Sequence, residues 1–275
     1  MEFIYNQHFE HIFLYFIIYS FFGWVYESLW SSFNEKEWVN RGFLSGPIIP
    51  IYGFGAVLFV LLLEDFNNVA VIFLLGMVIA CVLEYFTSWA MEKLFHSRWW
   101  DYHHYPFNLN GRICLYGALL FGVFAVLINK VIQPYVESFV NSFNSISLYT
   151  ISVIFMTLLI TDTIITVKKV LHLKERMQSL QEAINAHKQE AEERFTEYKK
   201  LYAERKEQIM TNLRLEFEES GFYNKLKEKY GELNSHEVRL LKAFPNFSSN
   251  EFDEAVIRIK NKIAEKRSRG KYENL

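Results

Sequence analysis

Five long apolar stretches occupy most of the first 167 residues, and they constrain the fold more than any other feature. A helix needs roughly 20 apolar residues to cross a bilayer, and fewer where the helix is broken. Inside lipid the backbone polar groups must be satisfied within the protein, so apolar stretches of this length predict helices. They lie at about 11–32, 48–64, 69–91, 113–133 and 146–167. The sequence therefore predicts an all-α, polytopic membrane domain with five spans.

Charge divides the chain near residue 167. Residues 1–167 contain only 6 of the 29 Lys and Arg residues and 12 of the 31 Asp and Glu residues. The remaining 23 basic and 19 acidic residues follow, and they are interspersed. We predict a transmembrane domain over 1–167 and a helical tail over 168–275. The basic excess of the tail is too small and too mixed to indicate nucleic-acid binding.

The two cysteines and the N-terminus exclude two further features. Cys81 and Cys114 lie in or beside apolar spans, which is not the pattern of a disulfide framework. The first apolar stretch lacks a preceding basic region and a following cleavage site, so it is not predicted to be a cleavable signal. No cofactor motif is present, and we expect none.

Basic residues in the loops predict the orientation of the spans. Nine of them lie between spans one and two, between spans three and four, or directly after span five, whereas the other side has only Lys130. Basic residues concentrate on the cytoplasmic side of membrane proteins. We therefore expect a multi-pass protein of the bacterial cell membrane, with the N-terminus outside and the C-terminus in the cytoplasm.

The membrane domain contains an internal repeat, with residues 11–64 resembling residues 69–133. Each half has a glutamate near the cytoplasmic end of its first span, Glu27 or Glu84, followed by an aromatic loop that ends in Asn, Arg and Gly. Each half then enters its next span through a Tyr-Gly pair. Both halves run in the same direction, which predicts a pseudo-two-fold axis along the membrane normal.

The repeat predicts a polar network near that axis. Charged side chains within a span are costly, so they turn inward to pair or to face water. We expect Glu27, Glu84, Arg41 and Arg112 to gather at the cytoplasmic side, with Asn40 beside Arg41. The network is either a site for a ligand or for protons, or a set of salt bridges that joins the two halves. The sequence leaves both interpretations open.

The loop "HSRWWDYHHYPFNLNGR", residues 96–112, adds further polar candidates. Its histidines and Asp101 follow no standard zinc spacing, so no metal site is predicted. Asp101 is expected to cap a helix or to pair with Arg98 or Arg112. For Asn108 and Asn110 two roles are open: contact with a polar ligand, or hydrogen bonds to loop backbone groups. Trp99, Trp100, Tyr102 and Tyr105 are interpreted as anchors at the membrane interface.

Three motifs carry a resemblance to a known family. "FFGWVYES", "NRGFLSGPIIPIYGFG" and "WWDYHHYPFNLNGRICLYG" together resemble the bacterial family described as putative ABC-transporter type IV permease, over most of residues 12–165. The resemblance implies a transport permease with two motif-bearing cytoplasmic loops. The chain has no GxxxxGK[ST] motif, so an ATPase would be a separate nucleotide-binding subunit.

The tail is predicted to be mostly helical. Residues from Lys168 to about Ser220 contain no proline or glycine, and apolar residues recur at steps of three, four and seven. This predicts one long amphipathic helix over 168–220, able to form a coiled coil and a homodimer or to fold back on the helices that follow. Those are expected at about 223–230 and 235–243, with a last helix after the capping box of Ser248 and Glu251. Asp162, just before the tail, is expected to pair with Lys168 or Lys169, or to reach the interface.

Three functions fit these observations. The first is a permease component of a transport system that contacts membrane lipid and works with a separate ATPase. The second is a membrane enzyme acting on a lipid at the inner leaflet, through its carboxylates and an arginine. No nucleophile with a partnered base is recognisable, so no catalytic residue is assigned. The third is a scaffold or sensor that signals through its helical tail.

Overall fold

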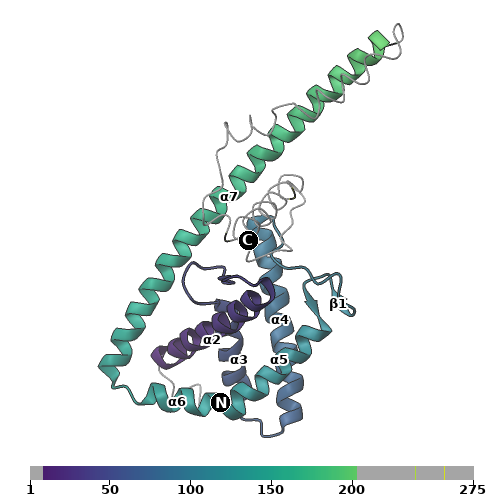
Figure 1. The fold of residues 1–275 in the computed structure, drawn as a ribbon. Coiled ribbons are helices and arrows are strands. Elements are labelled where there is room, and N and C mark those ends of the chain that lie inside the picture. The colour runs from purple at the N-terminus through teal and green to yellow at the C-terminus, as the bar shows by residue number, and fades with distance from the viewer. Residues whose placement is uncertain (1–8, 203–238, 240–256, 258–275) are drawn as a thin grey trace. The chain divides into compact units, whose positions relative to one another are not determined.

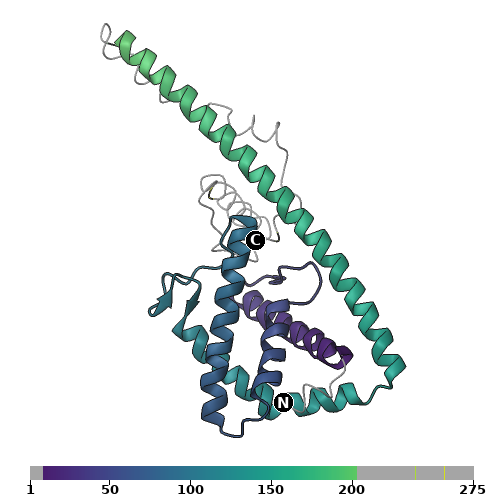
Figure 2. The same cartoon turned by 180° about the vertical axis from the view of Figure 1, so that it is seen from behind.

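The structure, a computed structural model, describes residues 9–202, 239 and 257, and it is built almost entirely of helices (Figures 1 and 2). The helices are α2 (Phe9–Glu35), α3 (Pro50–Leu63), α4 (Val69–Phe95), α5 (Leu115–Leu127), the π-helical turn η1 (Ile128–Ile132), α6 (Gln133–Asn141) and α7 (Ser145–Tyr202). The all-α prediction is confirmed. Two short antiparallel strands, β1 (Asn108–Leu109) and β2 (Ile113–Cys114), lie in the loop between α4 and α5.

Four of the helical segments are long and apolar enough to cross a membrane. They are Phe9–Glu35, Val69–Phe95, the continuous stretch Leu115–Asn141 and Ser145–Glu197. The second predicted span is shorter, because helix α3 has only 14 residues and begins at Pro50. At 1.5 Å per residue it measures about 21 Å, less than the roughly 30 Å of a bilayer's hydrocarbon core. The chain is a multi-pass membrane protein with four full-length helices and one short one.

The residues directly before α3 are not helical, and two of their amides are bonded to protein carbonyls. The amide of Ile49 donates to the carbonyl of Ser20 on α2 at 3.0 Å, and that of Ile48 donates to Gly46 at 2.9 Å. Pro50 then stands in the first turn of α3, where its missing N–H is not needed. Non-helical backbone is tolerated at membrane depth when protein satisfies it in this way.

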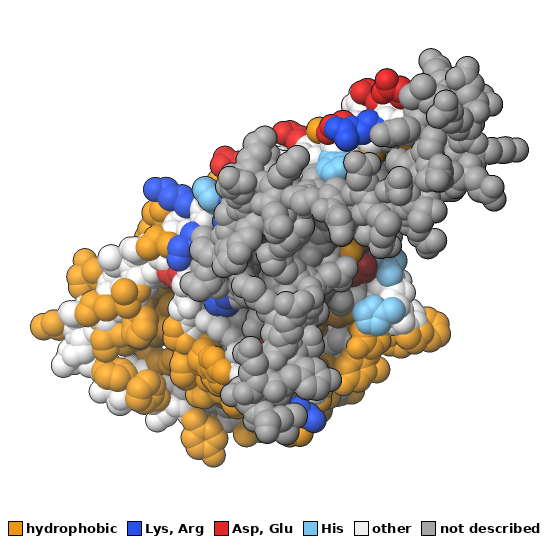
Figure 3. Space-filling view, turned by 45° about the horizontal axis from the view of Figure 1, so that its top comes forward, with side chains coloured by type: hydrophobic (Ala, Val, Ile, Leu, Met, Phe, Trp, Pro, Cys, Tyr) orange, Lys and Arg blue, Asp and Glu red, His pale blue; other side chains and the backbone are white. Residues whose placement is uncertain are grey.

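Helix α4 presents small and polar residues to the protein and large apolar residues away from it. Its buried residues recur every four positions, at Ile72, Gly76, Ala80, Glu84 and Ser88. A second row with the same spacing, Leu74, Val78, Val82 and Phe86, is exposed. Membrane helices pack through small residues and direct large apolar ones to lipid. Figure 3 shows such apolar side chains gathered over the lower part of the view. Glu84 therefore faces the protein and not the lipid.

The membrane helices form two consecutive helical hairpins. Helix α2 packs chiefly against α3, and α4 packs chiefly against α5. The loops 36–49 and 96–114, which we call the first and second motif loops, lie at the same end of α3, α4 and α5, opposite the turn at 64–68 (Figures 1 and 2). Lys130 marks that opposite end, since its Nζ donates to the carbonyl of Phe66 at 2.9 Å. Whether an axis relates the hairpins stays a prediction.

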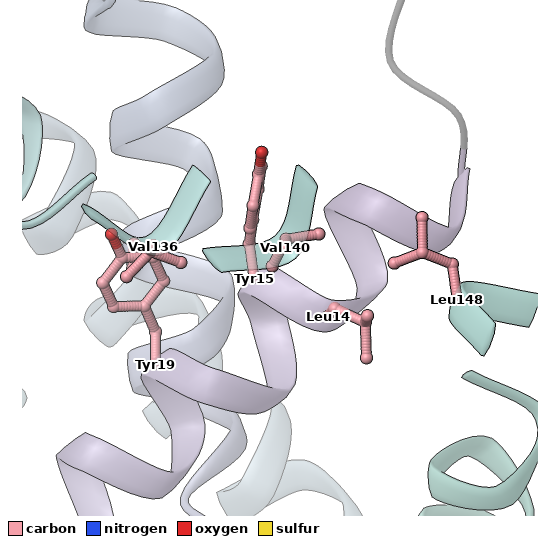
Figure 4. Packing of buried hydrophobic residues seen from close by; sticks show 7 residues of the cluster. Leu14, Tyr15, Tyr19, Val136, Val140 and Leu148 are labelled. Atoms are coloured by element: carbon pink, nitrogen blue, oxygen red, sulfur yellow. The ribbon is translucent and has the colours of Figure 1, made fainter. Parts of the chain in front are cut away.

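A buried cluster holds the start of α2 against α6 and the start of α7. It contains Leu14, Tyr15, Tyr19, Ala56, Val136, Val140 and Leu148, of which Figure 4 labels all but Ala56. The Tyr19 hydroxyl donates to Oε1 of buried Gln133 at 2.8 Å. This hydrogen bond satisfies two polar groups that would otherwise be costly in an apolar interior.

The described residues divide into two compact units. One contains residues 9–169 together with Arg239, and the other contains residues 170–202 and 257. Helix α7 is continuous through the boundary, and in the second unit Val170, Leu173, Met177 and Ile184 form a buried stripe. The coiled coil and the homodimer stay predictions. The helices expected at 223–230 and 235–243, and the capping box of Ser248 and Glu251, lie outside the described residues except for Arg239.

The contact between α2 and α3 requires a glycine at position 53. A Cβ there would overlap Ser20 Oγ and would lie 2.5 Å from the carbonyl oxygen of Phe16. We predict that Gly53→Ala lowers the free energy of unfolding by about 1–3 kcal/mol, because an overpacked contact must shift the backbone. Thermal unfolding in detergent micelles measures this change.

Gly55→Ala is the matched control on the same helix. A Cβ at that position would meet Leu83 Cδ2 at 3.6 Å, an ordinary contact. Alanine is also the better helix former, so this variant should be as stable as the wild type or slightly more stable. Equal losses in the two variants would contradict the close packing of α2 against α3.

Candidate polar site at the motif-loop end

Glu27 lies near the end of α2 and accepts a short hydrogen bond from the neighbouring helix. The hydroxyl of Tyr52, in the first turn of α3, donates to Glu27 Oε1 at 2.5 Å. Arg41, in the first motif loop, places its Nε 3.7 Å from Glu27 Oε2. The side chains of Arg41 and Glu27 are each a little over a quarter exposed, so this ion pair is only partly screened by solvent.

Glu84, on α4, also accepts a hydrogen bond from a tyrosine. The hydroxyl of Tyr102, in the second motif loop, donates to Glu84 Oε1 at 3.1 Å. Glu84 is 7% exposed, so its carboxylate is almost fully removed from solvent. Among the described residues no basic side chain forms an ion pair with Glu84. Its hydrogen bond comes from a neutral hydroxyl.

The two tyrosine–glutamate pairs lie close enough to influence each other electrostatically. Burial raises the pKa of the Tyr102 phenol above its ordinary value, and the negative charge of Glu84 and the hydrogen bond to it raise the pKa further. The charge of Glu27, from the other hairpin, acts in the same direction. We call Glu27, Tyr52, Glu84 and Tyr102 the tyrosine–glutamate site. In each pair the glutamate lies within a helix. Its tyrosine lies in the first turn of α3 in one pair and in the second motif loop in the other.

Arg112 does not join this site, contrary to the predicted gathering of two glutamates and two arginines. Its guanidinium lies 2.8 Å from Glu92 Oε2, donates to Ser88 Oγ at 3.3 Å and lies over the ring of Tyr85. Ser88 and Glu92 lie about one and two turns further along α4 than Glu84. Arg98 shares the same Glu92 oxygen at 3.4 Å. Glu92, near the end of α4, thus binds both arginines of the second motif loop.

Asn40 organises the backbone of the first motif loop. Its side-chain oxygen accepts from Trp24 Nε1 at 2.9 Å and from the amide of Gly42 at 3.0 Å. Its side-chain nitrogen donates to the carbonyl of Ser45 at 3.3 Å. All of these partners are protein groups, so Asn40 connects α2 to the loop that carries Arg41.

Asp162 on α7 binds the same loop, which corrects the expectation that it pairs with Lys168 or Lys169. Its two carboxylate oxygens accept from the amides of Ser45 and Gly46 at 3.1 and 2.8 Å. Thr166, one turn further along α7, donates to Asp162 at 3.2 Å. The carboxylate turns toward the loop because two backbone N–H groups need an acceptor there.

The second motif loop is a compact turn built around Asp101. Asp101 pairs with Arg98 at 3.9 Å, as one of the predicted alternatives had it, and accepts from both the amide and the ring of His103. Burial acts to raise the pKa of Asp101, but the hydrogen bonds from His103 and the charges of His103 and Arg98 outweigh it, so the pKa lies below its ordinary value. Arg112 is not its partner.

Asparagine and glycine complete this turn. Asn108 accepts from the amide of Gly111 at 3.0 Å and donates to the carbonyl of Tyr105 at 2.8 Å, so it satisfies loop backbone groups. Asn110 donates to the hydroxyl of Tyr85 at 3.1 Å. Gly111 has φ +66°, and a Cβ there would also overlap the Asp101 carboxylate and the His103 ring. Only glycine meets both conditions without strain.

The aromatic residues of the loop do not all act as interfacial anchors. Trp99 is 4% exposed and packs edge-on against Phe43 of the first motif loop and Phe95 of α4. Tyr102 is directed to Glu84, as described above. Tyr105, in contrast, is 40% exposed. Trp99 therefore joins the two motif loops, which is a structural role.

In the part of the chain that the structure describes, no group of three His, Cys, Asp or Glu side chains is arranged to hold a metal ion. The chemistry that the tyrosine–glutamate site can perform is acid–base and cation binding. Two carboxylates with phenol donors can accept a proton or a cationic group, and Arg41 limits the net negative charge.

Cys114 is buried and its Sγ accepts from the amide of Gly117, so it caps α5.

Sequence reasoning did not assign Tyr52 or Tyr102 to the tyrosine–glutamate site, and it did not identify Glu92 as the partner of Arg112. Tyr52 belongs to a Tyr-Gly pair of the predicted repeat. The tyrosine of the other pair, Tyr116, is 68% exposed, so the predicted repeat did not indicate the role of Tyr52. Tyr102 stood among aromatic residues that read as anchors. A search for donors able to satisfy each intramembrane glutamate would have identified tyrosines as candidates.

The comparisons with known proteins agree with this architecture. A profile of the family described as putative ABC-transporter type IV matches residues 14–167, which is more than half of the chain. The chain belongs to this family, as the three motifs predicted. The match contains α2 from residue 14 onward, the rest of both helical hairpins, both motif loops and Asp162. The comparisons with curated proteins and with solved structures returned no match.

We predict that Tyr102→Phe lowers the free energy of unfolding by about 1–3 kcal/mol, because the buried Glu84 carboxylate loses its hydrogen-bond donor. Tyr135→Phe serves as the control, since Tyr135 is 75% exposed on α6. Thermal unfolding in detergent at neutral pH measures both variants. An unchanged Tyr102→Phe would show that the phenol does not stabilise Glu84.

We also predict a pH-dependent loss for Asp101→Asn. Because the pKa of Asp101 is lowered by folding, its charged form stabilises the folded loop above the ordinary pKa of about 3.9. This contribution is lost as the pH falls through the lowered value. The midpoint of thermal unfolding should therefore be lower in the variant at pH 7, and the difference should narrow below about pH 4. A constant difference would contradict the role of this charge.

Proposed function

We propose that the chain is a membrane permease component of a transport system, and that the tyrosine–glutamate site is its polar site. Membership of an ABC-transporter family and the multi-pass helical architecture support a transport role. The chain carries no GxxxxGK[ST] motif, so we propose that ATP is hydrolysed by a separate nucleotide-binding subunit. We place the protein in the bacterial cell membrane, with both motif loops and the tail in the cytoplasm.

One observation carries the proposal: Glu84 is buried among membrane helices and its bonded partner is a neutral phenol. A carboxylate that served only to join helices would be expected to pair with an arginine, as Glu92 does with Arg112. Ionisable residues that face the interior of a membrane domain mark ion and substrate pathways. Glu27 on the other hairpin adds a second carboxylate, so the site suits a proton or a cationic group of the cargo.

The alternative of a lipid-modifying enzyme uses the same carboxylates. It differs in its partners, because an enzyme needs no nucleotide-binding subunit and would retain a bound lipid. A scaffold that signals through its tail would not need Glu84 to be ionisable. Partner recovery and the effect of Glu84→Gln therefore separate the three functions.

The experiment is purification of the wild type, Glu84→Gln and Glu137→Gln from native membranes in mild detergent, followed by measurement of ATP hydrolysis. We expect recovery of a nucleotide-binding subunit with all three. ATP turnover should fall at least about tenfold in Glu84→Gln, the effect of about 1.4 kcal/mol on a barrier. Glu137→Gln should match the wild type, since Glu137 lies on α6 near Glu64, at the opposite end of the helices.

Size-exclusion profiles and thermal unfolding establish that the variants are folded before turnover is compared. Recovery of the chain alone with a bound lipid would favour the enzyme. Recovery of the subunit with unchanged turnover in Glu84→Gln would remove the polar site from the transport mechanism, and the family relationship would stand without it.

A further inference from the structure

Two side chains of opposite charge bind the backbone of the first motif loop: an aspartate accepts from its amides and an arginine donates to its carbonyls. Asp162 accepts from the amides of Ser45 and Gly46, as described above. The guanidinium of Arg239 donates to the carbonyl of Gly42 at 2.8 Å and to that of Phe43 at 3.3 Å. The planar guanidinium, with its several N–H groups, can bridge two acceptors in this way.

Arg239 belongs to the same compact unit as the membrane helices, although it is 77 residues beyond Asp162 in sequence. Burial lowers the pKa of Arg239, and the negative charge of Asp162 acts to raise it. The guanidinium is thus partly withdrawn from water, next to two carbonyl oxygens and within the field of a carboxylate. A buried cation needs such partners, and here the loop and α7 supply them.

We propose that Arg239 docks the polar tail onto the first motif loop, and that this contact controls how firmly the loop is held. The family match ends at residue 167, so Arg239 lies outside it, whereas the loop and Asp162 lie inside it. The docking surface is the carbonyl edge formed by Gly42 and Phe43. Its occupant is a segment of this same chain.

The contact reaches the tyrosine–glutamate site through the neighbouring residue. Arg41 precedes Gly42, its amide donates to Ser28 Oγ at 3.3 Å, and its side chain pairs with Glu27. Release of Arg239 therefore loosens the segment that holds Arg41 beside Glu27. The tail thereby gains a route to regulate the polar site, although the docking itself does not depend on the transport role.

Hydrogen–deuterium exchange of the full chain in detergent tests the docking. The probes are the amides of Gly42, Ser45 and Gly46, each bonded to a side chain of the described residues. In Arg239→Ala we expect these amides to exchange about tenfold faster or more, while peptides of α4 and α5 keep their wild-type rates. Arg194→Ala is the control, because Arg194 is a highly exposed residue of α7 paired with Glu190.

Arg239→Lys keeps the positive charge but replaces the fork of donors with a compact ammonium. It should therefore also increase exchange in the loop, by less than Arg239→Ala does. If Arg239→Ala fails to fold, the exchange rates of the loop amides in Arg239→Lys test the proposal instead. Unchanged exchange of the loop amides in the folded variant, or equal effects of Arg194→Ala and Arg239→Ala, would overturn the proposal.

Discussion

A carboxylate within a bilayer must find its hydrogen-bond donors inside the protein, and this requirement organises the membrane unit. Glu27 and Glu84 lie on two different hairpins, and each accepts from a tyrosine hydroxyl. The donors reach them because α3 begins beside α2 with Tyr52 in its first turn, and because the second motif loop folds back over α4 with Tyr102. Both elements thus bring a hydroxyl to a carboxylate on a neighbouring helix.

The same requirement applies to the backbone of the two motif loops. In the first, Asn40, Asp162 and the carbonyl of Ser20 supply acceptors for amides that no helix satisfies. In the second, Asp101 and Asn108 do so, and Gly111 permits the turn that brings them together. Polar residues in these loops are therefore used mainly to hold a fixed backbone, which keeps Arg41 and Tyr102 in place beside the glutamates.

Much of the fold could be predicted from the sequence, because long apolar stretches and the three motifs are strong local signals. The short α3 was harder to predict, since Ile48 and Ile49 are as apolar as helix residues, but their amides bond to the carbonyls of Gly46 and Ser20 outside any helix. Tertiary choices between equivalent partners could not be read from one sequence. Arg112 had Glu84 and Glu92 within reach along α4 and lies beside Glu92. Asp162 had nearby lysines and binds loop amides.

The residues of the candidate site could also be predicted only in part from the sequence. Glu27 and Glu84 stand out in sequence because charges inside apolar spans are rare. Tyr52 and Tyr102 do not, since tyrosine is also common at membrane interfaces, where it serves as an anchor. Only the folded arrangement distinguishes a tyrosine that donates to a carboxylate from one that faces lipid headgroups. Tyr116 is an example, because the predicted repeat aligns it with Tyr52 but the structure leaves it exposed.

The central claim is that Glu27 and Glu84 share one site, and a double-mutant cycle of unfolding free energies tests it most directly. The cycle compares Glu27→Gln, Glu84→Gln and the double variant in detergent. Each single substitution relieves the same repulsion between the carboxylates, which the double substitution can relieve only once. The double variant should therefore lose more stability than the sum of the single losses. Additivity within about 0.5 kcal/mol would place the two glutamates in separate environments and contradict the shared site.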